Sequence, residues 1–272
     1  MDTELTYHLK SLAQKYETKE FLIGDPSWFM HQVEGDTNKE LLAFIASCLS
    51  YGSRKQFLPK IEQILTWSHG NITEWLINKE YTIHIPNDSR CFYRLYSNTM
   101  MRDMLDALCI MIKEYGSIKL FLTHSTISHN QENSGNIHAD EPCATNLTAL
   151  NAINAITIWF NEHGSKGIIP LPYGNSSCKR LCMFLRWMVR DNSPVDIGGW
   201  SDIIDKRSLI IPMDTHVIQE ANRLGLLESK TASMSSAIKL TNKLKDVFPD
   251  DPLKGDFALF GLGVGSIPSR KI

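Results

Sequence analysis

The sequence predicts an all-α protein, and two observations support that prediction. Apolar residues recur every three to four positions through most of the 272 residues, which is the helical period. Strand-like alternation is confined to Tyr81–Ile85, and Pro86 ends it directly. A chain of this length is long enough for one large domain or for two small ones that share an interface.

Helices are predicted wherever the apolar rhythm persists for about ten residues or more. The predicted helices are Leu5–Lys15, Glu40–Leu49, Gln56–Trp67, Met100–Lys113, Leu147–Phe160 and Cys178–Arg190. By contrast, Thr123–Asn146 is rich in Ser and Asn, which predicts a solvated loop and a boundary between two helical lobes, 1–145 and 146–272. Its His, Asp, Glu and Cys residues match no common zinc spacing, so no metal site is predicted.

The composition indicates an ordinary globular protein, with 43% hydrophobic and 21% charged residues. The acidic start Met1–Glu4 is followed by no signal-peptide pattern, and no apolar stretch approaches the ~20 residues that span a bilayer. We therefore expect a cytoplasmic protein without membrane contact. The net charge of −2 shows no general basic excess, so any nucleic-acid contact must use a local cluster of cations.

One segment combines a turn with a basic helix. The turn-rich Pro170–Ser177 opens directly onto the predicted helix Cys178–Arg190, on which Lys179, Arg186 and Arg190 share a face at spacings of 7 and 11 residues. The helix carries four cations and no anion. Outward-facing turn amides beside a basic face would form a phosphate platform, and the alternative is a merely solvated basic face.

A second segment places a carboxylate at the start of a helix. After the apolar entry Leu209–Ile211, the residues Pro212 and Asp214 precede a helical pattern that ends at Gly225. Asp214 is therefore expected to cap this helix. A capping position also favours an ionised carboxylate, which an enzyme that stabilises a cationic sugar requires.

The block Pro-x-Asp-Thr-His-Val at 212–217, preceded by a turn and a lysine-bearing helix, resembles the helix-hairpin-helix DNA glycosylases. It is most similar to the archaeal 8-oxoguanine DNA glycosylase branch and its uncharacterised bacterial relatives, a family defined by a domain of unknown function. Ser50–Gln56, Val195–Trp200 and Asp251–Gly263 also resemble blocks of that bacterial family, so the resemblance extends from residue 40 to residue 264.

This resemblance implies a two-lobed helical glycosylase fold with a variant helix-hairpin-helix motif. It implies a base-excision repair glycosylase with AP-lyase activity, in which Lys179 is the amine nucleophile and Asp214 the activating carboxylate. The expected substrate is double-stranded DNA that contains a damaged base, an oxidised purine such as 8-oxoguanine. The expected protein is a nucleoid-associated monomer without cofactor or metal, since no cysteine follows Cys182 to hold the iron–sulfur cluster of some relatives.

The same resemblance assigns further residues to the substrate. The expected DNA contacts are Gly174, Asn175, Ser176, Ser177, Arg180, Arg186, Arg190 and His216, and the base-pocket candidates are Tyr51 and Gln56. Leu171-Pro172-Tyr173-Gly174 meets the hairpin signature Leu-Pro-Gly-x-Gly only in part, because Tyr173 replaces a glycine. Two alternatives stay open: the same machinery directed at another lesion or at abasic sites, and a non-catalytic helix-hairpin-helix module that binds DNA or a protein.

Overall fold

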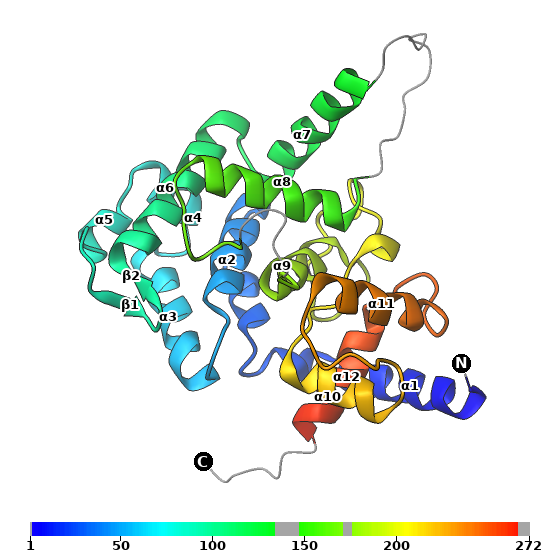
Figure 1. Cartoon of the computed structure of the whole chain (residues 1–272). Coiled ribbons are helices and arrows are strands. Elements are labelled where there is room, and N and C mark those ends of the chain that lie inside the picture. The colour runs from blue at the N-terminus through cyan, green and yellow to red at the C-terminus, as the bar shows by residue number, and fades with distance from the viewer. Residues whose placement is uncertain (1, 134–146, 171–175, 266–272) are drawn as a thin grey trace. The chain divides into compact units, whose positions relative to one another are not determined.

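The fold is described from a computed structural model, which covers the chain except residues 1, 134–146, 171–175 and 266–272. The described chain is helical apart from one two-stranded antiparallel sheet, so the predicted all-α class is confirmed. It divides into two compact units (Figure 1). Unit 1 contains residues 1–28, 174–201 and 206–272, and unit 2 contains residues 29–173 and 202–205.

Unit 2 is built around one buried helix. Its elements are α2 (Asp36–Leu49), α3 (Arg54–Trp67), α4 (Ile72–Ile77), α5 (Tyr81–His84), β1 (Cys91–Tyr93), β2 (Tyr96–Ser97), α6 (Asn98–Tyr115), α7 (Ile118–Asn133) and α8 (Ala149–Glu162). Every residue of α2 from Glu40 to Leu49 is buried, and α3, α4 and α7 pack against it. The buried Glu40 carboxylate accepts a hydrogen bond from the Ile118 amide at 2.6 Å, which satisfies a donor at the start of α7.

The predicted strand Tyr81–Ile85 is wrong, because this segment forms the short helix α5. An alternating pattern would bury Tyr81, Ile83 and Ile85 together. Instead, Tyr81 and Ile85 are fully buried at helical spacing, whereas Ile83 is 77% exposed. The strands of the chain lie further on, at β1 and β2, and were not predicted because they are only three and two residues long.

The predicted loop Thr123–Asn146 is also wrong over its first part, since α7 continues to Asn133. The hydroxyl groups of Thr123, Ser125 and Thr126 donate to backbone carbonyls four residues earlier, at 2.9–3.0 Å. These bonds satisfy the polar side chains within the helix. The rest of the predicted loop, 134–146, lies outside the described residues.

In unit 1, α12 is the helix on which others pack. The elements are α1 (Thr3–Tyr16), η1 (Lys19–Leu22), α9 (Lys179–Val189), η3 (Lys206–Ser208), α10 (Thr215–Arg223), α11 (Met234–Lys245) and α12 (Lys254–Gly265). Both α1 and α10 run against α12 (Figure 1).

Two glycines of α12 permit this close packing. A Cβ at Gly261 would lie 2.2 Å from the Tyr16 ring, and a Cβ at Gly263 would lie 2.8 Å from the His216 Cβ, so only glycine permits these approaches.

The two units do not coincide with the predicted lobes 1–145 and 146–272. The first helix belongs with the last because α1 packs along α12. Residues 146–173 belong to unit 2 because α8 packs on α6 and α7, with the Trp159 Nε1 donating to the Ala107 carbonyl at 3.1 Å. The chain therefore passes between the two units several times rather than once near residue 145.

Within the described ranges, no helix has the length and apolar character needed to cross a membrane. The same residues contain no group of three or more His, Cys, Asp or Glu side chains arranged to hold a metal ion. Cys48, Cys91, Cys109, Cys178 and Cys182 are not joined in disulfide bonds.

Candidate active site

Lys179 and Asp214 lie together in unit 1. Lys179 is the first residue of α9, and Asp214 is the N-cap of α10, where its Oδ1 accepts a hydrogen bond from the Val217 amide at 2.8 Å. The Lys179 Nζ lies 3.6 Å from the Asp214 Oδ2. Asp214 therefore caps α10 as expected, and it lies close to Lys179 although 34 residues separate the two in the chain.

The two oxygens of Asp214 have different neighbours. Oδ1 is held by the helix amide, whereas Oδ2 faces the amine of Lys179. The Lys179 side chain is 36% exposed and that of Asp214 is 14% exposed, so a substrate can reach the amine while the carboxylate is largely covered. An accessible amine beside a fixed carboxylate is the arrangement that amine nucleophiles and their bases require.

The turn before α9 is described only from Ser176 onward; Gly174 and Asn175 lie outside the described residues. Ser176 is exposed, and its Oγ accepts a hydrogen bond from the Cys178 amide at 3.1 Å. Ser177 is only 6% exposed, and its carbonyl accepts from the Cys182 thiol. Ser177 is therefore not placed to contact DNA with its side chain, and the Cys178 amide is already satisfied.

The prediction that Arg186 and Arg190 contact DNA is wrong. Arg186 is 5% exposed and Arg190 is 1% exposed, and both guanidinium groups are bound by carboxylates inside unit 1. The helix α9 carries no anion of its own, but its partners come from other segments. The face predicted as a basic platform is therefore an internal ion-pair network.

This network joins two arginines to four carboxylates. Arg190 pairs with Glu17 at 2.7 Å, with Asp251 at 2.8 Å, and with Asp196. Arg186 pairs with Asp256 at 2.6 Å and with Asp196 at 3.3 Å. The Arg186 guanidinium also lies over the Phe257 ring, 4.6 Å from its centroid. The network ties α9 to α12 and to the residue that follows α1.

Burial affects the carboxyl groups of this network. It raises the pKa of Asp256 to about 6; the Arg186 guanidinium opposes the shift, and the charge of Asp214 adds to it. Burial also raises the pKa of Asp196, which Arg186 and Arg190 oppose. The network and the Lys179–Asp214 pair are linked through α9, which carries both Arg186 and Lys179.

The raised pKa of Asp256 predicts a pH dependence of stability. Between pH 3.8, the ordinary pKa of an aspartic acid, and about pH 6, the folded protein binds more protons at Asp256 than the unfolded chain does. The contribution of Asp256 to the free energy of unfolding is therefore full below pH 3.8 and is lost as the pH rises through 6. Asn mimics the protonated acid. We therefore expect the free energy of unfolding of Asp256→Asn, minus that of the unsubstituted protein, to rise from pH 4 to pH 7 in urea titrations. The exposed Asp250→Asn serves as control; a flat or falling difference for Asp256→Asn would contradict the prediction.

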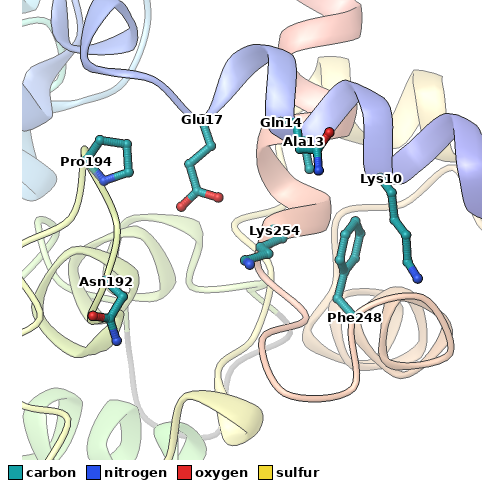
Figure 2. A pocket seen from close by; sticks show the side chains of 8 residues that line it. All are labelled: Lys10, Ala13, Gln14, Glu17, Asn192, Pro194, Phe248 and Lys254. Carbon is teal, nitrogen blue, oxygen red and sulfur yellow. The ribbon is translucent and has the colours of Figure 1, made fainter.

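The network reaches solvent at a cavity of about 450 Å³ in unit 1. Glu17, Asn192, Pro194 and Lys254 lie around it, as Figure 2 shows. Because Glu17 also binds Arg190, one end of the buried network is accessible from this cavity. Lys179 and Asp214 do not line it.

Two other predicted DNA contacts, Arg180 and His216, are half-buried in unit 1. Arg180 follows Lys179 on α9. His216 is the second residue of α10, and its ring meets the Phe260 ring of α12 edge-on at 6.4 Å. Their contact with DNA stays a prediction.

The base-pocket candidates Tyr51 and Gln56 lie together in unit 2, beside the hairpin of β1 and β2. The Arg94 guanidinium lies 5.4 Å from the centroid of the Tyr51 ring, and its Nη1 donates to the Gln56 Oε1 at 3.4 Å. The Tyr51 hydroxyl accepts a hydrogen bond from the Leu95 amide at 3.1 Å. Tyr51 and Gln56 therefore both support the tip of this hairpin.

The hairpin tip has an unusual surface. Leu95 is 83% exposed, and Arg94 beside it has a φ of +52°. Gly52 has a φ of +83°, and a Cβ there would lie 2.4 Å from the Arg94 Nη1, so the approach of Arg94 to Tyr51 requires glycine. An exposed leucine is thus held in place by polar contacts beneath it.

Comparison with known proteins identifies one family. A family model described as a protein of unknown function, DUF2400, matches residues 25–265. No curated protein and no solved structure matches the chain.

Proposed function

The chain belongs to this family of unknown function, so its activity is inferred from its own residues, and we propose that it is a DNA base-excision repair glycosylase with AP-lyase activity. The observation that carries the proposal is the 3.6 Å approach of the Lys179 Nζ to the Asp214 Oδ2. The resemblance of the segments around both residues to helix-hairpin-helix glycosylases supports it. The fold would then be a glycosylase fold with a variant helix-hairpin-helix motif.

The proposed reaction begins with a flipped nucleotide, because the glycosidic bond is shielded inside a duplex. The neutral amine of Lys179 attacks C1′, and the bond from C1′ to the damaged base breaks with its electron pair moving to the base. Asp214 accepts a proton from the amine and offsets the positive charge that develops on the sugar. The deoxyribose ring then opens: the C1′–O4′ bond breaks, O4′ takes a proton, and a Schiff base forms between C1′ and the Lys179 nitrogen. The Schiff base loses a C2′ proton, which expels the 3′ phosphate, and water then hydrolyses the C1′–N bond and releases Lys179.

The proposed substrate is duplex DNA with an oxidised purine, for which 8-oxoguanine is the first candidate. Tyr51 and Gln56 stay the candidates for recognising the base, because an aromatic ring and an amide suit a purine. Arg94 contacts both side chains, so a bound base would have to displace it. The proposed reaction consumes no metal or organic cofactor. We further propose that the protein acts as a monomer in the cytoplasm, on the nucleoid.

The test is borohydride trapping on duplexes that each carry one lesion: 8-oxoguanine, another oxidised base, or a preformed abasic site. Borohydride reduces a Schiff base to a stable amine, so an enzyme–DNA adduct on a denaturing gel reports the intermediate. Adducts with a base lesion support a glycosylase, and adducts with abasic sites only support the narrower lyase. Duplex binding without any adduct would support the non-catalytic module instead.

The exposed Leu95 predicts a role in opening the duplex. An exposed apolar side chain at the tip of a hairpin can enter the base stack of a bound duplex and unstack it. We expect Leu95→Ala to lower the adduct rate on duplex DNA by about 10-fold and to leave the rate on single-stranded abasic DNA unchanged. Ile83→Ala, which removes a similarly exposed (77%) side chain of unit 2, is the matched control. Equal effects of the two substitutions would remove Leu95 from the mechanism.

A further inference from the structure

The helix α12 contacts both helices that carry the proposed catalytic residues. The Arg186 Nη1 of α9 lies 2.6 Å from the Asp256 Oδ2 of α12. On the other side, α10 lies so close that a Cβ at Gly263 would be 2.8 Å from the His216 Cβ. The placement of Lys179 on α9 and of Asp214 at the start of α10 therefore depends on one common helix.

The ion pair and Lys179 share one face of α9. Lys179, Cys182 and Arg186 are three and seven residues apart, so they lie along that face. Asp256 is 4% exposed and is bound by Arg186. The charge of Asp214 contributes to the raised pKa of Asp256.

We infer that Asp256 is a positioning residue for the Lys179–Asp214 pair: held by Arg186, it fixes α9 on α12 and adds a second negative charge to that of Asp214. The inference rests on the proposed function. A lysine amine attacks only when it is neutral, and nearby negative charge favours the ammonium form. Asp256 thus affects both the position of the amine and the pH at which it becomes reactive.

Several charged or titratable groups affect the environment of Asp256. They are Cys182 and Arg186 of α9, Asp214 at the start of α10, Asp196 of the segment after α9, and Asp25, which acts on Arg186. Asp256→Asn removes one negative charge from this set and leaves Arg186 with Asp196. The substitution therefore changes charge and anchoring together.

The first measurement uses the DNA-free protein, so that it does not depend on the proposed function. The rate of reductive methylation of Lys179, followed by mass spectrometry across pH 6–10, reports the reactive fraction of the amine. We expect Asp256→Asn to shift this profile toward lower pH, because the substitution removes a negative charge. In the trapping assay, we expect the same variant to lower the adduct rate by about 10- to 100-fold with unchanged duplex affinity, because the amine is displaced.

Asp251→Asn is the matched control. Asp251 is similarly buried, at 7% exposure, and belongs to the same network. It binds Arg190 instead of Arg186, and Arg190 lies four residues further from Lys179 in the chain. We expect Asp251→Asn to lower stability without shifting the Lys179 profile. If both variants shift it equally, or if Asp256→Asn leaves it unchanged, the positioning role is overturned.

A second variant keeps the charge and weakens the anchor. Arg186→Lys retains a cation but loses the planar guanidinium, whose Nη1 binds Asp256 while its Nε faces Asp196. We expect this variant to form the adduct more slowly, while the pH dependence of Lys179 methylation stays unchanged. An unchanged rate of adduct formation in a folded variant would overturn the role of the ion pair. A shifted methylation profile combined with no adduct on any DNA would refute the proposed function while supporting the effect of Asp256 on Lys179.

Discussion

Replacement of Lys179 by glutamine is expected to abolish the borohydride-trapped adduct and to lower strand cleavage at a damaged base by at least ~10³-fold. Glutamine retains a polar side chain at the start of α9, but its amide cannot form a Schiff base. The measurement is a denaturing gel of trapped adducts and a single-turnover cleavage rate. Lys243→Gln, at an exposed lysine of α11, is the control and should react like the unsubstituted protein.

The companion substitution separates chemistry from helix capping. Asp214 both caps α10 and faces Lys179, so its removal could act through either role. Asp214→Ser keeps a good capping oxygen and removes the carboxylate. We expect it to fold and bind duplex DNA but to form adducts far more slowly. An adduct that persists in Lys179→Gln, or full activity in Asp214→Ser, would disprove the mechanism.

The largest effect on stability is expected from Arg190→Met. Arg190 is 1% exposed and binds three carboxylates, so its loss leaves Glu17, Asp196 and Asp251 without their shared cation. Removal of one partner from a buried ion-pair network typically costs ~3–5 kcal/mol, because the remaining charges are left uncompensated. Urea unfolding at pH 7 measures this loss.

The control for Arg190→Met is Arg223→Ala. Arg223 also pairs with a carboxylate, Glu220 at 2.7 Å, but its side chain is 58% exposed, and such surface pairs contribute ~0–1 kcal/mol. Comparable losses in the two variants would show that the network is not an important source of stability in unit 1.

The sequence predicted α1, α2, α3, α6, α8, α9 and α10 because their evidence is local, whereas α4, α11 and α12 were not predicted. The apolar rhythm of Glu40–Leu49 reports the buried face of α2, and a carboxylate before the helical pattern of Thr215–Arg223 reports the cap at Asp214. The short strands β1 and β2 hold too few residues to show a period. The exposure of Leu95 was not predicted because it depends on how the hairpin tip rests on Tyr51.

The interpretation of Arg186 and Arg190 failed for a related reason. Within Cys178–Arg190 the cations have no anion, so a solvated or DNA-binding face was the natural prediction. Their partner Asp256 lies 70 residues beyond Arg186, and Glu17 lies 173 residues before Arg190. A helical wheel contains no information about charges that other segments bring, so the network follows only from the tertiary structure.

The pairing of α1 with α12 has a consequence for how the chain is made. Residues 29–173 of unit 2 are contiguous and can fold as they leave the ribosome, whereas the first helix must wait for the last one to be synthesised. At ~5–20 residues per second, that delay lasts tens of seconds. During this time the buried face of α1, with Leu9 and Leu12, has no native partner on α12. Truncation within the final helix would likewise leave the first helix without its partner.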